Sequence, residues 1–172
     1  MGETLRPAVA GFNRSLSIET RSERLSGDPG AVLLREVLDA TDIVPWMTAQ
    51  MKDDRRQADV IHDLPSLVRT MVLLAAQGWR DHDDADALRY DPAMRLAVSS
   101  SAGLTPLADD AGLASQPTLS RCTAMLAQPG NLRVLREAAL ELAGRNLCAE
   151  NGGARRDRIT LDVDSLPIEV HG

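Results

Sequence analysis

The amino-acid sequence predicts a mainly α-helical protein whose last residues begin a β-sheet. Apolar residues recur with the helical period of 3.6 from residue 31 to about residue 148. Aromatic residues make up only 2% of the chain, so the core must consist of Leu, Val, Ala and Met, which suits helices. A clear period-two alternation occurs only in residues 159–172.

Residues 1–30 carry weak signals and are expected to form a tail or a short edge strand. Leu16 and Ile18 alternate with polar neighbours, and Pro29-Gly30 closes the polar stretch that follows. An edge strand needs a sheet to join. We therefore expect the segment around Leu16–Ile18 to pair with the strand at the other end of the chain.

Residues 31–150 form the predicted helical region, in which cap signals separate the helices. Asp63 is expected to cap the most strongly patterned helix, which should end near Gly78 and lie at the centre of the core. Other expected caps are Asp28, Thr41 or Asp42, Asp91 and Ser115. Pro129-Gly130-Asn131 is expected to be a turn and cap before a last, long helix.

Overall charge and hydropathy limit the class of protein. The formal net charge of -6 argues against a protein that coats nucleic acid, because a basic surface is the usual requirement for that role. The longest apolar run, residues 71–76, is far below the roughly 20 residues that a membrane span needs. We expect no membrane association and a cytoplasmic location. Cys122 and Cys148 are isolated thiols without a metal-site spacing.

Two charged stretches are expected to have structural explanations. Residues 81–86 (DHDDAD) resemble a cation loop, but the required glycine is Asp86, and the twelfth position is Pro92 instead of glutamate. Carboxylates at a helix start are favoured by the helix dipole alone. Residues 52–59 (KDDRRQAD) fit a solvated segment, and a phosphate contact through Arg55 and Arg56 is the alternative.

Residues 113–121 (LASQPTLSR) carry a pattern typical of the start of a DNA-contacting helix. With the segment before it, this helix resembles the second half of a helix-turn-helix. Side chains expected to face outward and contact DNA are Gln116, Thr118, Ser120 and Arg121. Helix capping explains Ser115 and Pro117 equally well, so both explanations remain open.

The terminal strand places Asp162 and Asp164 on one face, where they are able to share a cation. Arg155 and Arg156 lie just before it. They are expected either to form a solvated linker or to steer a phosphate toward the carboxylates.

Together these motifs resemble the DDE transposases of bacterial insertion sequences, the group called DDE domain group 1. The motifs are residues 78–92 (GWRDHDDADALRYDP), 113–121 (LASQPTLSR) and 159–172 (ITLDVDSLPIEVHG), and residues 30–38 (GAVLLREVL) resemble the family's entry helix. The resemblance covers approximately residues 16–172.

The resemblance implies that residues 31–150 form a helical DNA-binding or association region, and that residues 151–172 begin an RNase H-like α/β catalytic domain. Family members cut and join DNA at their element ends with three carboxylates that hold two Mg²⁺ or Mn²⁺ ions. Asp164, followed by Ser165, matches the first carboxylate, and Asp162 is the weaker choice. Leu166 departs from the family, in which many members carry Thr.

Relatives supply the second Asp and the Glu farther downstream, and no residue of this chain matches them. The resemblance therefore implies an N-terminal portion with an incomplete RNase H-like domain, inactive alone because a two-metal site needs several ligands. Its expected partners are element-end DNA and a second copy of the chain. Two alternatives stay open, namely a non-enzymatic helical DNA-binding regulator and a protein-interaction domain, which the net charge of -6 would suit.

Overall fold

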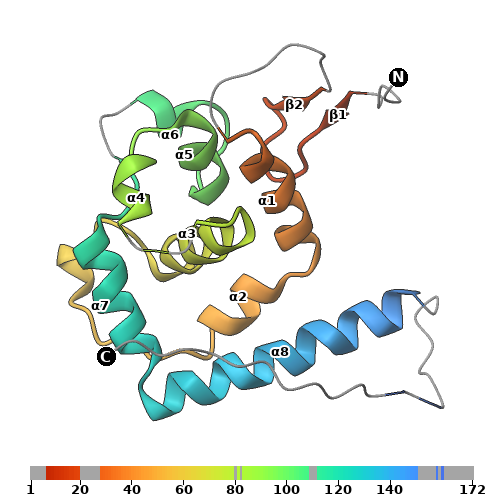
Figure 1. The fold of residues 1–172 in the computed structure, drawn as a ribbon, viewed down its shortest axis with the longest axis vertical. Helices are drawn as coiled ribbons and strands as arrows, with labels where there is room; N and C mark the ends of the chain where they lie inside the picture. Colours follow the sequence, from red (N-terminus) through yellow and green to blue (C-terminus); the bar gives the residue numbers. More distant parts are fainter. Residues whose placement is uncertain are drawn as a thin grey trace.

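A central helix, α3 (Leu64–Ala76), lies among α1, α2, α5 and α7 and contacts all four (Figure 1). The computed structural model describes residues 7–19, 28–79, 81, 83–108, 112–150, 158 and 160. The side chains of Leu67 and Leu73 in α3 are each only 1% exposed. The prediction of a central core helix is confirmed.

Both ends of α3 follow from local sequence. The Asp63 side chain accepts a hydrogen bond from Ser66 N at 2.8 Å, which satisfies one of the free amides at the helix start. At the other end Gly78 takes a φ of +86°, where a residue without Cβ is favoured. Gly78 N donates to Ala75 O and Trp79 N to Leu74 O, the pair of bonds of a Schellman motif.

The helix α1 (Gly30–Ala40) packs against α5 (Pro92–Val98), and α2 (Ile43–Thr48) follows it directly. The expectation that the Asp28 side chain caps α1 is wrong, because Pro29 holds the cap position and no side chain bonds there. Before α2, Thr41 Oγ1 accepts from Ile43 N at 3.3 Å. Asp91 caps α5 as predicted, accepting from Met94 N at 2.9 Å.

Two buried arginines bind the chain at the end of α5. Arg35 Nη1 donates to the carbonyls of Ala97 and Ser99, and its Nε lies 2.8 Å from an Asp39 carboxylate oxygen. Arg69 Nη1 donates to Ser100 Oγ at 2.9 Å, and burial beside Arg35 lowers the pKa of Arg69. These bonds satisfy carbonyls that the helix end leaves without a helical partner.

The N-terminal segment is a two-stranded antiparallel sheet, β1 (Ala8–Val9) with β2 (Ser17–Ile18). The Glu36 carboxylate of α1 accepts from Gly11 N and Phe12 N at 2.8 and 3.2 Å, which ties the hairpin to the helical body. A strand at this place is confirmed, and its partner among the described residues is β1. The expected pairing with the terminal strand concerns residues outside the described part.

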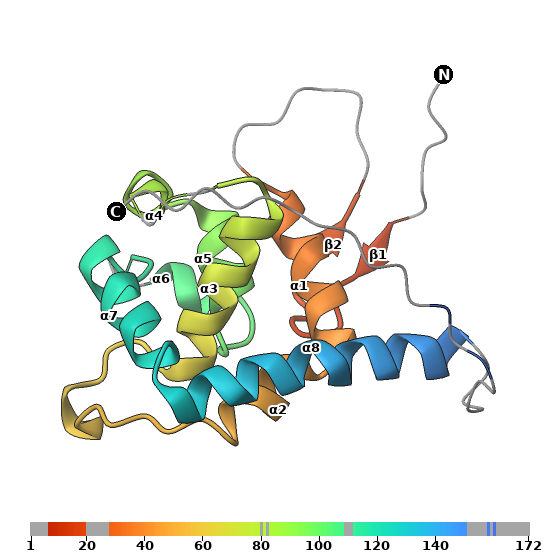
Figure 2. The same ribbon diagram turned by 60° about the horizontal axis from the view of Figure 1, so that its bottom comes forward.

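The remaining helices are α4 (Asp84–Ala87), α6 (Thr105–Ala108), α7 (Gln116–Leu126) and α8 (Pro129–Glu150). The expected turn at Pro129-Gly130-Asn131 is absent, because α8 begins at Pro129 itself. Pro fits the first turn of a helix, where its missing amide has no partner to lose. Figures 1 and 2 show α8 running across α2 and α7. The described helices include none long and apolar enough to cross a membrane.

Candidate nucleic-acid interface

A well-fixed segment, residues 52–62, connects α2 to α3 and contains the short 3-10 helix η1 (Gln57–Asp59). Asn131 in the first turn of α8 holds its start. Asn131 Oδ1 accepts from Lys52 N at 2.8 Å, and Nδ2 donates to Lys52 O at 3.0 Å and to Met125 O at 3.1 Å. Because Asn131 is only 2% exposed, these bonds form away from competing water.

Arg55 fixes the other end of this segment. Its Nε and Nη2 bind both carboxylate oxygens of Asp53 at 2.8 and 2.6 Å, and its Nη1 donates to His62 O at 2.9 Å. The Arg55 guanidinium holds the pKa of the Asp53 carboxyl below its usual value. These hydrogen bonds make Arg55 a structural residue that holds residues 52–62 together. This agrees with the structural explanation of the charged stretch.

Between residues 54–62 and α7 lies an open cleft of about 610 Å³. Its charged lining residues are Asp54, Arg55, Arg56, Asp59, Arg89 and Arg121, and the His62 imidazole lines it as well. Most of these charges are paired: Asp54 with Lys52 at 2.8 Å, Arg56 with Asp59 at 3.7 Å, and Arg89 with Asp86 at 3.9 Å. Four arginines and two aspartates line the cleft, and three of the arginines are paired, which leaves the charge of Arg121 to attract a negatively charged ligand.

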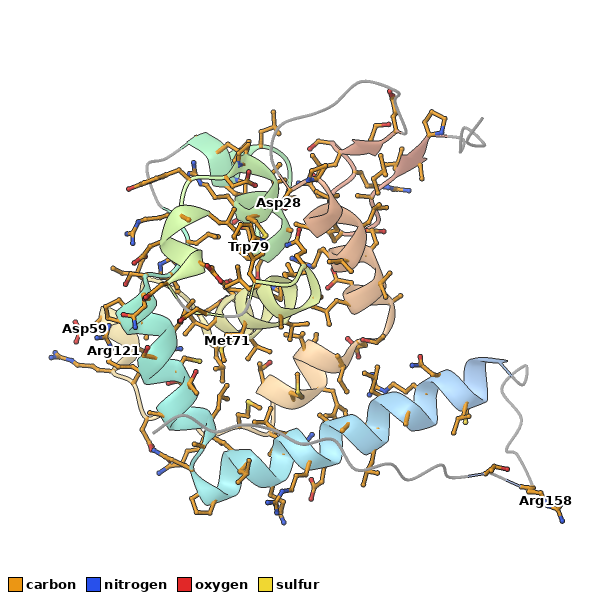
Figure 3. All side chains as sticks on the ribbon, in the orientation of Figure 1. Asp28, Asp59, Met71, Trp79, Arg121 and Arg158 are labelled. Atoms are coloured by element: carbon orange, nitrogen blue, oxygen red, sulfur yellow. The ribbon has the colours of Figure 1, made fainter. Side chains whose placement is uncertain are left out.

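Arg121 is the arginine of this cleft whose charge is not neutralised by a carboxylate among the described residues. Its side chain is exposed, and Nη2 donates a hydrogen bond to Thr118 Oγ1 at 3.1 Å. Figure 3 shows Arg121 on α7 and Asp59 on η1 at the same edge of the molecule, where both line the cleft. A guanidinium in this position has several donors left for a phosphate.

Ser115 holds the cap position of α7, as expected, but its side chain does not supply the cap bond. The Ser115 side chain makes no bond to the helix amides, and its Oγ lies 3.1 Å from Thr118 Oγ1. Instead the Asp86 carboxylate at the end of α4 accepts from Gln116 N at 3.3 Å. A carboxylate thus occupies the place where the helix dipole favours an anion. The end of α7 that faces Asp86 is for this reason a poor phosphate site.

The structure brings the four α7 residues of the sequence prediction onto neighbouring turns. Gln116 Nε2 donates to Ser120 Oγ at 3.1 Å, and Arg121 binds Thr118. Only Arg121 is exposed, and the other three are half-buried. The expected helix-turn-helix depends on residues 109–113 before α7, and residues 109–111 lie outside the described part of the chain.

Arg89 and His62 also line the cleft, and the sequence analysis missed both. Gly112 allows the chain to pass close to Arg89: a Cβ on Gly112 would lie 2.5 Å from Arg89 Cγ, and Leu113 N donates to Arg89 O at 2.9 Å. Burial and the charge of Arg89 lower the pKa of His62, so its imidazole is neutral at pH 7. Gly112, the residue before the 113–121 motif, was the available signal for this close approach.

The predicted metal residues Asp162 and Asp164, together with Arg155 and Arg156, lie outside the described residues. Within the part of the chain that the structure describes, no cluster of three or more His, Cys, Asp or Glu side chains is arranged to hold a metal. In the acidic stretch, Asp84 accepts from Asp81 N at 3.0 Å and Asp81 from Asp83 N at 3.3 Å. These bonds to backbone amides support the structural explanation of that stretch.

A helical body with an arginine-lined cleft is compatible with a protein that acts on nucleic acid, and comparison of the sequence with protein families gives the class. The sequence matches the family described as Transposase DDE domain group 1 over residues 8–172. The chain therefore belongs to this family of DDE transposases, and the resemblance seen in the sequence is confirmed. Neither the curated proteins nor the solved structures contain a match to it. Family membership implies DNA transposition as the general function, and the family generally uses divalent metal ions.

Proposed function

We propose that this chain binds the DNA ends of its element through the cleft between α7 and residues 52–62, as the N-terminal part of a transposase. The observation that carries the proposal is Arg121, exposed in an arginine-rich cleft without a carboxylate partner among the described residues, in a chain of a DNA-transposing family. Residues 31–150 are the DNA-binding and association region, and the hairpin within residues 7–19 attaches to it.

The second part of the proposal concerns residues 151–172, where an RNase H-like catalytic domain begins. Its support is that the family match continues through this stretch to residue 172. Asp164, or less favourably Asp162, would hold a Mg²⁺ or Mn²⁺ ion, which stabilises charge on the phosphoryl oxygens when bound. Arg155 and Arg156 would steer the DNA backbone toward this carboxylate.

Residues 1–172 alone are proposed not to cut or join DNA. Asp164 supplies one of the three carboxylates, and no residue of this chain matches the other two. One carboxylate cannot fix two metal ions about 3.5–4 Å apart. Self-association belongs to the same proposal, and the exposed Leu132 and Leu140 of α8 are its candidate contacts, 37% and 76% exposed.

A gel-shift series with a duplex carrying the element end tests this proposal. We expect a shift at about 50 mM salt that weakens steeply by about 200 mM, because each phosphate contact releases counterions. With Mg²⁺ or Mn²⁺ added, the duplex should remain uncut. No shift at about 50 mM salt would reject DNA binding and favour the protein-interaction alternative. Cleavage that Asp164→Ala abolishes would reject the proposed inactivity.

The same series separates the transposase proposal from a DNA-binding regulator. A transposase end-binding region should prefer the element-end duplex to a scrambled duplex of equal length and composition. Replacing Arg155 or Arg156 by alanine should reduce the salt slope by about one each, as the loss of one phosphate contact does. An unchanged slope in both variants would remove these two residues from the proposed interface.

A further inference from the structure

Ile61 is 86% exposed, more than any other large apolar side chain in the described part of the chain. A single exposed isoleucine is common on protein surfaces and by itself requires no explanation. Its position does require one, because Val60, Ile61 and His62 line two clefts at once. Ile61 therefore stands on a ridge, with the 610 Å³ arginine-lined cleft on one side and a second cleft of about 470 Å³ on the other.

Small polar groups form a large part of the lining of the second cleft. Hydroxyl side chains contribute six of its lining residues, namely Ser66, Thr70, Ser99, Ser100, Ser101 and Thr105. Arg95 lines it as well, and its Nη2 donates to Pro106 O at 2.6 Å. Hydroxyl groups both donate and accept, and they are frequent partners of the phosphate and sugar groups of DNA.

The ridge is held rigidly in place. Arg55 binds His62 O on one side of Ile61, and on the other side Asp59 N donates to Arg56 O at 2.9 Å within η1. The next residue after His62 is Asp63, the cap of the central helix α3. A side chain on a fixed ridge loses little conformational freedom when it contacts a partner, so this geometry favours insertion.

We infer that Ile61 is an apolar wedge that inserts between two stacked base pairs of a duplex lying across the ridge. The inference rests on the proposed DNA binding and adds to it the residue that deforms the DNA. Proteins that bend DNA insert Ile, Leu, Phe or Met side chains between base pairs, with arginines beside them. Here Arg56 and Arg121 lie in the first cleft and the hydroxyl groups in the second. A protein partner fits less well, because polar and charged groups flank Ile61 on both sides.

The test uses the element-end duplex with 2-aminopurine substituted at successive positions, and a second duplex carrying a donor and an acceptor dye at its ends. On binding the wild-type chain, 2-aminopurine fluorescence should rise several-fold at one base step, and the end-to-end distance should shorten. Ile61→Ala should remove most of both changes and weaken binding about tenfold, as the loss of a buried isoleucine side chain implies. The salt slope should stay unchanged, because no phosphate contact is lost.

Two further variants make the result specific. Ile61→Phe should restore unstacking, since an aromatic ring also serves as a wedge. Val37→Ala, which changes another exposed apolar side chain (65% exposed) on α1, should leave all signals at wild-type values. Wild-type binding without a fluorescence rise at any step would overturn the wedge and leave DNA binding intact, as would wild-type signals in Ile61→Ala. No wild-type binding at all would overturn the wedge together with the proposed function.

Discussion

The side-chain amide of Asn131 binds both backbone groups of Lys52, a residue 79 positions earlier in the chain. The amide makes the two hydrogen bonds that a backbone peptide group would make. It thereby joins α8 to the start of the segment that forms one wall of the arginine-lined cleft. Asn13 makes the same pair of bonds with Gly103, at 2.8 Å to Oδ1 and 2.6 Å from Nδ2. Two buried asparagines thus hold together parts of the chain that helix packing alone would leave independent.

Replacing Asn131 by alanine should lower the free energy of unfolding by about 2–4 kcal/mol, because buried backbone groups lose their partners. Asn13→Ala should cost a similar amount, since the Asn13 side chain is equally buried and bonds both backbone groups of Gly103. Urea denaturation measures both. At a temperature where both variants remain folded, only Asn131→Ala should weaken DNA binding, because only Asn131 holds the cleft wall. Equal DNA binding by the two variants would mean that the cleft wall held by Asn131 does not contribute to the DNA interface.

Three aspartates near helix starts differ in whether their side chain bonds a helix amide: Asp63 and Asp91 do, and Asp28 does not. Asp63→Ala and Asp91→Ala should each lower the unfolding free energy by about 1 kcal/mol, since each removes a bond to a helix amide. Asp28→Ala should stay within about 0.5 kcal/mol of wild type, because its side chain makes no cap bond. A loss at Asp28 as large as at Asp63 would contradict this assignment.

The pair of Asp53 and Arg55 predicts a pH dependence of stability. The pKa of Asp53 is lowered in the folded chain, so the folded state binds its proton less readily than the unfolded state does. The resulting stabilisation is fully present above the unfolded pKa of about 3.9 and is lost as pH falls through the lower folded value. In urea titrations Asp53→Asn should be less stable than wild type at pH 7, and the difference should disappear as the pH falls below 3.9. A stability difference between Asp53→Asn and wild type that does not change with pH would mean that packing, and not the charge of Asp53, causes it.

Self-association through α8 should depend on Leu140. Leu140→Lys places a charge on the proposed contact, where burying it is unfavourable, so the variant should be monomeric at concentrations where wild type associates. Val37→Lys on α1 carries the same change at a comparably exposed position and is the matched control. Sedimentation velocity over a range of concentrations measures both. If the Leu140→Lys variant still associates, this face of α8 is not the contact surface.

Structural features that depend only on residues close together in the sequence were predictable. The caps Asp63 and Asp91 and the stop at Gly78 each depend on positions within one helical turn, and all three are as expected. The start of α8 at Pro129 was misjudged because a Pro-Gly pair signals a turn as well as a first helical turn.

Long-range contacts explain what the sequence analysis of the site lacked. Ser115 holds the cap position of α7 as expected, but the side chain that bonds the helix start is that of Asp86, 30 residues earlier than Gln116. Arg89 enters the cleft because the chain at Gly112 passes against it. Neither contact has a signature in local periodicity. Within residues 113–121, Arg121 was predicted to face outward and does.

The most direct test of the account is the salt dependence of element-end binding in two arginine variants. Arg121→Ala should reduce the slope of log affinity against log salt by about one, the loss of one phosphate contact. Arg136→Ala removes an exposed arginine of α8, a helix that does not line the cleft, and should leave the slope at the wild-type value. An unchanged slope for Arg121→Ala, or an equal loss for Arg136→Ala, would contradict DNA binding at this cleft.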